Sequence, residues 1–216
     1  MRLTRIVIFA KAPVPGRVKT RLAPVLGMAG AAWLARAMFD EVCRRALSTN
    51  FGPVELCLAP EKAASAWDRI ALPHGADISA QGEGDLGARM ARASQRVLAG
   101  DENILLIGTD CLDLTAAMLN TAAATLETHD AVIHPAHDGG YTLLGLRQYH
   151  GSLFNDIVWS TDTVAATTLE RLAALGWRTW IGETLHDIDR PRDLERLPRA
   201  WRQHLGCASG PVPEQV

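Results

Sequence analysis

The sequence lacks most of the signatures of covalent, metal-cluster and membrane chemistry. Its 216 residues include four cysteines and no CxxC pair, so neither a disulfide framework nor a zinc site is expected. No GxSxG motif is present, which leaves nucleophilic acyl chemistry without support. No run approaches about 18 apolar residues, the length that a transmembrane helix needs. The chain opens directly on an apolar segment without a secretory leader, and we expect a cytoplasmic protein with reduced thiols.

A strong net charge of either sign is also missing. The 22 Lys and Arg residues nearly balance 24 Asp and Glu residues, giving a formal charge of -2. A duplex nucleic acid partner is therefore not expected, and any cationic site must be local. The length and the 48% hydrophobic share fit one globular domain, predicted over residues 1–205, with a flexible tail over residues 206–216.

Apolar segments alternate between the periods of strands and helices along the chain. Strands are predicted over residues 6–9, 54–59, 76–81, 104–108, 131–133, 141–146 and 177–181, and helices over residues 27–47, 61–70, 90–98, 115–128, 163–175 and 191–197. The segment 104–108 is short and apolar throughout, as are strands covered by helices on both faces. This alternation predicts an open, mainly parallel α/β sheet, whose ligands lie beyond the carboxyl ends of the strands.

A dense cationic loop, within the segment FAKAPVPGRVKTRL, follows the first predicted strand. Pro13 and Pro15 stiffen its backbone, and Gly16 permits a close backbone approach. It is not a Walker A loop, because Val18 stands where that motif needs a glycine. The loop suits phosphates held mainly by side-chain cations, with a solvated basic turn as the alternative. These cations are Lys11, Arg17, Lys19 and Arg21.

Carboxylates stand at two later positions that suit a metal ion. Asp110 follows the buried strand 104–108, where a carboxylate can bind Mg²⁺ together with a substrate phosphate. The alternative for Asp110 is capping of the next helix, for which Asp113 or Thr115 is better placed. Asp187 and Asp189 project to one side of an extended segment, because side chains alternate with period two. One of them can cap the helix that Pro191 opens while the other binds metal.

The segment QGEGDLGARM places three glycines around two carboxylates at the start of a helix. Backbone amides and the positive end of the helix dipole are available there for a nucleoside or its phosphates. The alternative is a surface loop with a capped helix. The candidate binding residues are Gln81, Gly84, Asp85, Gly87 and Arg89.

A third group of candidates concerns the sugar or the acceptor. Asp138, Gly139, Gly140 and Tyr141 can form a tight turn, or the aspartate can orient a sugar hydroxyl while Tyr141 stacks on a ring. Trp159 either lines the acceptor side or belongs to the core.

The spacing of His134 and His137 argues against a zinc site. Residues three apart on a strand lie on opposite faces of the sheet, so the two imidazoles cannot converge on one metal ion.

Five of these segments, in order, resemble one protein family. FAKAPVPGRVKTRL, QGEGDLGARM, GTDCLDL, HDGGYTLLGL and HDIDRPRDLERL, spanning residues 9–197, are similar to the DUF2064 group, also labelled "transferase 1, rSAM/selenodomain-associated". That group belongs to the nucleotide-diphospho-sugar transferase (GT-A) superfamily. The resemblance implies a GT-A fold, a three-layer α/β/α arrangement with a mainly parallel sheet, and a divalent cation, Mg²⁺ or Mn²⁺.

The resemblance also implies roles for particular residues. The basic loop is similar to that of 2-phospho-lactate guanylyltransferases, and IDRPRDL is similar to the VDTPEDL of sugar-nucleotide synthetases. In that comparison Asp110 and Asp189 match the two metal-binding aspartates. The chain departs from many glycosyltransferases because the segment from Asp110 to Asp113 is not a DxD triplet, which leaves the second ligand to the distant Asp189.

The expected protein is thus a metal-dependent transferase with a nucleotide-containing donor. Glycosyl transfer from a nucleotide-sugar to a small-molecule acceptor is the first expectation. Nucleotidyl transfer, in which a phosphorylated small molecule attacks an NTP and pyrophosphate leaves, is the second. A non-catalytic nucleotide-binding protein is the third. Lys19, Arg21 and Asp110 are the expected catalytic residues. The two cations would neutralise the phosphates of the donor, and the metal ion on Asp110 and Asp189 would stabilise the leaving group. The phosphate-binding set is Lys11, Pro13, Gly16, Arg17, Lys19 and Arg21.

Overall fold

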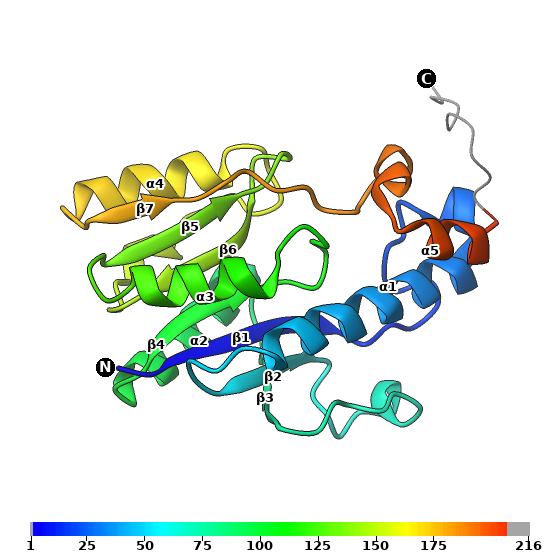
Figure 1. Cartoon of the computed structure of the whole chain (residues 1–216), viewed down its shortest axis with the longest axis horizontal. Helices are drawn as coiled ribbons and strands as arrows, with labels where there is room; N and C mark the ends of the chain where they lie inside the picture. The colour runs from blue at the N-terminus through cyan, green and yellow to red at the C-terminus, as the bar shows by residue number, and fades with distance from the viewer. Residues whose placement is uncertain (1, 207–216) are drawn as a thin grey trace.

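A computed structural model describes residues 2–206, and its centre is a seven-stranded sheet (Figure 1). The strand order is β3-β2-β1-β4-β6-β5-β7. Strand β6 is antiparallel to both of its neighbours, and the other pairs are parallel. The predicted mainly parallel sheet is therefore confirmed. The strands are β1 (Thr4–Lys11), β2 (Val54–Ala59), β3 (Ala76–Ala80), β4 (Asn103–Ile107), β5 (Ala131–Pro135), β6 (Tyr141–Leu146) and β7 (Thr179–Ile181).

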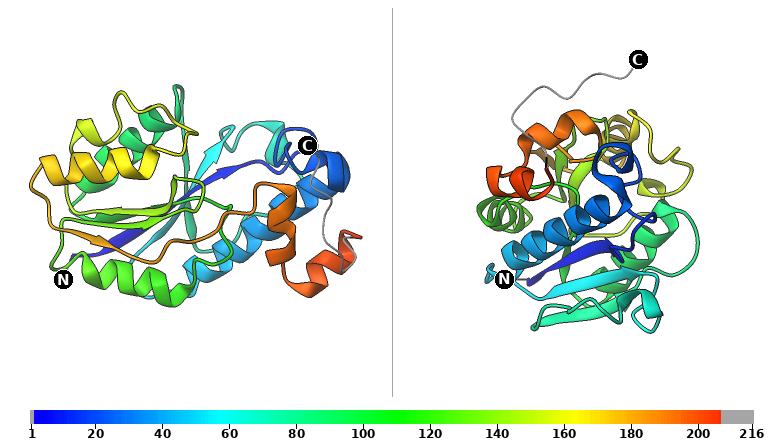
Figure 2. Two further views of the ribbon diagram at one scale, coloured as in Figure 1. Left: turned by 90° about the horizontal axis from the view of Figure 1, so that it is seen from above. Right: turned by 90° about the vertical axis from the view of Figure 1, so that its right-hand side faces the viewer.

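Helices cover both faces of the sheet, which gives the three layers that the family resemblance implied (Figure 2). The helices are α1 (Ala23–Leu47), α2 (Leu86–Ala99), α3 (Ala116–Thr125), α4 (Val164–Ala174) and α5 (Arg199–His204). Buried side chains of α1 and α3 pack on one face, and those of α2 and α4 pack on the other. No helix in this described part of the chain is both long enough and apolar enough to cross a membrane.

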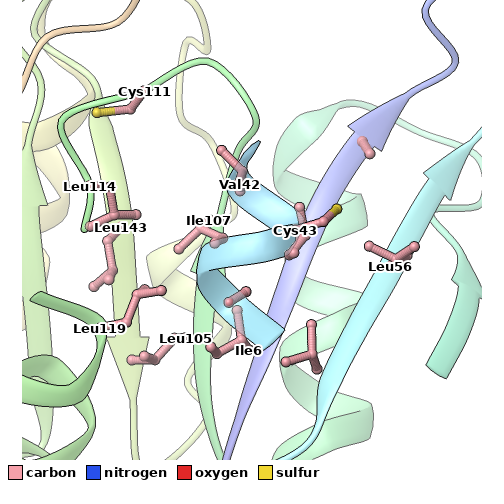
Figure 3. Close-up of a cluster of buried hydrophobic side chains, with 14 of the residues drawn as sticks. Ile6, Val42, Cys43, Leu56, Leu105, Ile107, Cys111, Leu114, Leu119 and Leu143 are labelled. Carbon is pink, nitrogen blue, oxygen red and sulfur yellow. The ribbon is translucent and has the colours of Figure 1, made fainter. Parts of the chain in front are cut away.

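The core follows from the alternation of side chains along the central strands. In β1, Ile6 and Ile8 pack toward α1, whereas Val7 packs toward α2. All five residues of β4 are buried, because this strand is covered on both faces. Figure 3 shows the α1 side of this core, where Val42 and Cys43 of the helix face Ile6 and Ile107 of the sheet. Cys43, Cys57 and Cys111 are buried free thiols, and Cys207 lies outside the described residues.

Two predicted helices differ in the structure. Residues 61–70 contain only a 3-10 turn, Ser65–Trp67, because their backbone hydrogen bonds join residues three apart, as from the Trp67 amide to the Ala64 carbonyl oxygen. The segment predicted as residues 191–197 is a 3-10 helix, Pro191–Arg196, which ends shortly before Pro198. Helix α5 follows it and was not predicted. Of the predicted tail, residues 207–216 lie outside the described part.

Helix α1 begins four residues earlier than predicted, but it is broken at Gly27, whose φ of 69° and ψ of 165° are not helical. The predicted start at that glycine therefore marks a real change of backbone. Helix α3 is capped by Thr115, whose hydroxyl accepts a hydrogen bond from the Met118 amide at 3.2 Å. Asp110 is not this cap.

Helix α1 also holds the loop that follows Asp110. The Arg45 guanidinium donates hydrogen bonds to the carbonyl oxygens of Leu112 and Leu114 at 2.5 and 3.0 Å. Glu41, one turn earlier, accepts from Arg45 at 2.7 Å and orients it. Hydrogen bonds from Arg44 and then Arg45 lower the pKa of the Glu41 carboxyl to about 2. The ionised form of Glu41 is therefore stabilised by folding.

Replacing Glu41 with glutamine should destabilise the protein in a pH-dependent way. A carboxyl whose pKa falls on folding stabilises the native state above its ordinary pKa, and this contribution is lost as the pH falls toward about 2. We expect Glu41→Gln to cost about 1 kcal/mol at pH 7 and clearly less at pH 3, measured by urea unfolding. Glu170→Gln, at an exposed position of α4, is the matched control. An equal loss at both pH values would contradict the assignment.

Candidate functional site

A cleft of about 1340 Å³ lies at the carboxyl edge of the sheet. Strands β1 and β4 are neighbours there, with β2 beyond β1 on one side and β6 beyond β4 on the other. Such a switch point is where open α/β sheets hold ligands. The cleft is lined by predicted site residues from distant parts of the sequence: Lys11, Arg17, Lys19, Arg21, Gln81, Asp110, Asp138, Gly140, Tyr141, Trp159 and Asp189.

Other predicted site residues, all within the described part of the chain, do not line this cleft. They are Pro13, Gly16, Gly84, Asp85, Gly87, Arg89 and Gly139. Asp85 caps α2, since its carboxylate accepts a hydrogen bond from the Ala88 amide at 2.8 Å. Arg89 donates to the Gly84 carbonyl at 2.9 Å and to the Gln81 side chain at 3.3 Å. These contacts match the alternative of a loop that leads into a capped helix.

Gln81 lines the cleft, but its amide group is already occupied. Its nitrogen donates to the carbonyl oxygens of Ala10 and Cys57 at 3.3 and 3.0 Å, and its oxygen accepts from Arg89. The side chain is buried and ties the ends of β1 and β2 to the chain that follows β3. Gln81 therefore shapes the floor of the cleft and has little hydrogen-bonding capacity left for a nucleobase.

Lys19 and Asp110 form an ion pair at the centre of the site. The ammonium Nζ lies 2.8 Å from Oδ1 of Asp110 and also donates to the carbonyl oxygen of Ile188. The Lys19 side chain is only 4% exposed, whereas that of Asp110 is 54% exposed. The cation is thus buried under a carboxylate that stays open to solvent. Lys19 also has a positive φ of 47°, an uncommon conformation for a residue with a side chain.

A second ion pair joins the same two parts of the chain. The Arg21 guanidinium donates to the Asp189 carboxylate, and both groups are partly exposed. The chain after β7 runs across the molecule to reach this position beside the start of α1 (Figures 1 and 2). Leu22, Leu34 and Met38 pack there against Ile188 and its neighbours. Apolar packing and charge therefore hold the basic loop against the segment that carries Asp187 and Asp189.

The carboxylates after β4 and around residue 188 lie close enough to influence one another. The amide of Ile188 donates to the Asp110 carbonyl oxygen at 2.8 Å, which sets the two segments side by side. Burial, followed by the negative charges of Asp110 and Asp138, raises the pKa of the Asp187 carboxyl to about 7. Neither Asp187 nor Asp189 caps the following 3-10 helix, because Arg190 holds the N-cap position. Asp193 accepts hydrogen bonds from the amides of Asp189 and Arg190.

The turn between β5 and β6 forms part of the opposite wall. The Asp138 carboxylate accepts a hydrogen bond from the Gly140 amide at 2.9 Å, as in the predicted tight turn. Gly139, with φ of 89°, packs against the backbone of Asp162, and a Cβ atom added there would lie 2.1 Å from the Asp162 carbonyl oxygen. The glycine thereby lets the turn approach the segment Ser160–Asp162, which also lines the cleft.

Two aromatic residues complete this wall. Burial raises the pKa of Tyr141, whose hydroxyl contacts the Met90 sulfur at 3.7 Å. Trp159 packs against α2 at Gly87, where a Cβ atom would lie 2.5 Å from the indole nitrogen. Gly87 therefore positions Trp159, which both lines the cleft and packs against the core.

The two histidines separate as the strand geometry predicted. His134 is buried in the core, with Nδ1 3.0 Å from the Glu183 carbonyl oxygen. His137 lines the cleft and stacks on His186, with ring centroids 3.6 Å apart. Burial and the positive charge of Arg196 lower the pKa of His186.

Sequence reasoning missed the arginines of the segment that follows Asp189. Arg190, Arg192 and Arg196 are exposed and line the cleft beside the basic loop. The segment RPRDLER, with three arginines in seven residues, indicates a second cationic patch. The sequence prediction used only the preceding carboxylates, Asp187 and Asp189.

Replacing Gly139 with alanine should separate the two loops of the opposite wall, the turn at residues 138–140 and the segment 160–162. The substitution adds both the strain of a positive φ and a clash with the Asp162 backbone, so we expect a loss of about 2–4 kcal/mol in urea unfolding. Gly176→Ala is the matched control, because Gly176 has φ of 70° and no atom within 4 Å of the added Cβ. That control should cost only about 1 kcal/mol. Equal losses in the two variants would contradict the packing role.

The solved structures similar to this chain share its fold. A protein from Desulfovibrio desulfuricans G20, provisionally named a nucleotide-diphospho-sugar transferase, is 30% identical with a TM-score of 0.85, covering 93% of this chain and 88% of that one. Rv0371c from Mycobacterium tuberculosis H37Rv, in complex with manganese, is 17% identical with a TM-score of 0.51, covering 96% and 100%. A cytidylyltransferase from Leptospira borgpetersenii is 14% identical with a TM-score of 0.58, covering 90% and 84%.

The family comparison agrees with the motifs. No curated protein matches the chain. Residues 42–161, more than half of the sequence, match the family described as "Uncharacterized protein conserved in bacteria (DUF2064)". Together with the full-length similarity to the Desulfovibrio protein, this match confirms the predicted family and fold. The chain belongs to the DUF2064 family and has the nucleotide-diphospho-sugar transferase fold.

Proposed function

We propose that the protein is a metal-dependent glycosyltransferase that moves a sugar from a nucleotide-sugar to a small-molecule acceptor. The observation that carries this proposal is the meeting, in one cleft, of the cations after β1 with the carboxylates after β4 and around residue 188. The name of the Desulfovibrio relative supports a nucleotide-sugar as the donor.

The basic loop is the proposed site for the diphosphate of the donor. Lys11 and Arg17 line the cleft and have no ion-pair partner within residues 2–206, so they are available to an anionic ligand. Arginine and lysine are the usual partners of phosphate oxygens, and charge-assisted hydrogen bonds are the stronger ones. These cations would stabilise the negative charge that develops on the leaving nucleoside diphosphate.

The carboxylates fit a divalent cation of the kind that works with phosphates. In the described part of the chain, no three His, Cys, Asp or Glu side chains form a cluster that could enclose a metal ion. Mg²⁺ does not need such a cluster, since it commonly binds one or two carboxylates together with waters and substrate phosphates. Asp110 and Asp189 supply hard oxygen ligands at the cleft surface, and Asp187 adds a third carboxylate beside them. The manganese complex of Rv0371c supports the same choice.

In this proposal Asp110 and Asp189 hold the cation, which neutralises phosphate charge when bound. The protein's own residues orient the acceptor on the opposite wall. An acceptor hydroxyl attacks the anomeric carbon, the bond from that carbon to the diphosphate oxygen breaks, and the hydroxyl proton passes to a carboxylate. Asp138 and Asp162 are the carboxylates of this wall, and Tyr141 and Trp159 supply a ring-stacking surface.

A second candidate function is nucleotidyl transfer. Arg190, Arg192 and Arg196 line the cleft beside the basic loop, and such cations favour an acceptor that carries its own phosphate. The fold is also that of cytidylyltransferases. In this reaction the acceptor phosphate attacks the α-phosphorus of an NTP and pyrophosphate leaves.

Product analysis separates these functions. The purified protein is incubated with Mg²⁺ or Mn²⁺ and panels of nucleotide-sugars, NTPs and small-molecule acceptors. Release of a nucleoside diphosphate supports the glycosyltransferase, and release of pyrophosphate supports the nucleotidyltransferase. Nucleotide binding in calorimetry, without turnover of any pair, would identify the non-catalytic alternative.

Replacing Asp110 with asparagine should abolish most of the activity found in that screen. The substitution keeps the shape of the side chain but removes the charge that the cation and Lys19 require. We expect the turnover number to fall by at least about 100-fold, which is typical for loss of one electrostatic group in an active site. Asp101→Asn is the matched control, because Asp101 is 96% exposed and, among residues 2–206, forms an ion pair with Arg2 alone. A turnover number within about threefold of the wild-type value would contradict the role of Asp110.

A further inference from the structure

In the two ion pairs of the site, the groups proposed to bind phosphates are paired with the groups proposed to bind the metal ion. Lys19 and Arg21 are two of the four cations expected to hold phosphates, yet each contacts a carboxylate of the proposed metal site. Asp110 and Asp189 likewise have their charge compensated by the protein itself. While these two ion pairs are formed, Lys19 and Arg21 are not available to phosphates, and Asp110 and Asp189 are not available to a metal ion.

We propose that Lys19 and Arg21 are exchangeable counter-ions of Asp110 and Asp189. A divalent cation displaces the ammonium and the guanidinium from these carboxylates, and the displaced groups then bind the phosphates of the nucleotide. The divalent cation and the phosphates therefore bind with positive cooperativity. This inference rests on the proposed function, since it assigns the proposed metal and phosphate ligands to one coupled exchange.

The exposures of the side chains show where a cation can enter. Asp110 is 54% exposed although its partner Lys19 is only 4% exposed, so the carboxylate is approached from the cleft and the ammonium lies beneath it. In the second pair Arg21 is 63% exposed and Asp189 is 36% exposed. An incoming cation can reach both carboxylates without opening the core.

The backbone around Lys19 is consistent with a side chain held by its partners. Lys19 has φ of 47°, a conformation that costs energy in a residue with a side chain and persists only when the surroundings impose it. The surroundings here are the Asp110 carboxylate and the Ile188 carbonyl oxygen, the two acceptors of its ammonium. Removal of Asp110 from this pair by a divalent cation leaves a mobile four-carbon side chain next to Arg17 in the basic loop.

Cooperativity follows from the competition for the carboxylates. Without phosphates, a divalent cation must displace two positive groups that then have no anionic partner. With phosphates present, the displaced groups gain new partners, and the cation binds more tightly. Because linkage is reciprocal, the cation must strengthen phosphate binding by the same factor. Lys11 lines the same cleft without a carboxylate partner in the described chain, so it contributes to phosphate binding alone.

The test measures the metal and the phosphate separately in the full-length protein. Binding of Mn²⁺ alone is followed by the electron paramagnetic resonance signal of the free ion, and binding of preformed magnesium pyrophosphate by calorimetry. Pyrophosphate is the probe because it carries the two phosphates without a nucleobase. The variants are Lys19→Met, Arg21→Gln and the control Lys11→Met.

The exchange predicts opposite effects of one substitution on the two ligands. Lys19→Met should bind Mn²⁺ about tenfold more tightly than the wild type and magnesium pyrophosphate about tenfold more weakly. Arg21→Gln should change both in the same directions by about threefold, since its pair is more exposed. Lys11→Met should weaken only the binding of magnesium pyrophosphate. Arg21 lies at the surface, so its variant tests the proposal even where Lys19→Met fails to fold.

Two negative results are distinguishable. If the wild type binds Mn²⁺ and magnesium pyrophosphate but Arg21→Gln and folded Lys19→Met bind Mn²⁺ no better than it does, the exchange is overturned and the proposed function stands. If the wild type binds neither probe, the proposed function fails and the exchange fails with it.

Discussion

The contact on which the site depends is the attachment of the segment around Ile188 to the chain that follows β4. One backbone hydrogen bond of 2.8 Å joins the Ile188 amide to the Asp110 carbonyl oxygen, and the Lys19 ammonium donates to the carbonyl of the same isoleucine. Leu34 and Met38 of α1 pack beneath this junction. The main-chain hydrogen bond and the apolar packing hold these segments side by side whether or not the Lys19 ammonium stays on Asp110. Preorganisation of this kind reduces the entropy that binding would otherwise lose.

Carboxylates and cations lie close together at the same junction, and each sign of charge compensates the other. Four carboxylates lie within mutual influence around Asp187, and the cations of the basic loop compensate part of their repulsion. Burial, and after it the negative charges of Asp110 and Asp138, raise the pKa of the Asp187 carboxyl. The carboxylates of the site therefore favour binding of positive charge, even though the net charge of the whole chain is only -2.

Much of the fold followed from periodicity, whereas much of the site's detail did not. The strands β2 and β6 were predicted to the residue, because apolar alternation and flanking turns define them. The convergence of Asp110 with the basic loop followed from the rule that ligands lie at carboxyl ends of strands. The ion pairs of Lys19 and Arg21 could not be predicted, since a sequence gives no distances between side chains. The same limit applied to Gln81 and Arg89, whose polar groups are used inside the protein.

The two edge strands of the sheet, β3 and β7, affect how copies of the chain can associate. Strand β7 has only three residues, and β3 has five, one of them the charged and exposed Asp77. Such short edge strands offer few free backbone groups to a neighbouring molecule, and a charged side chain such as Asp77 further disfavours pairing at β3. Joining of sheets edge to edge is therefore disfavoured, and a stable homodimer would have to bury helical or loop surface instead.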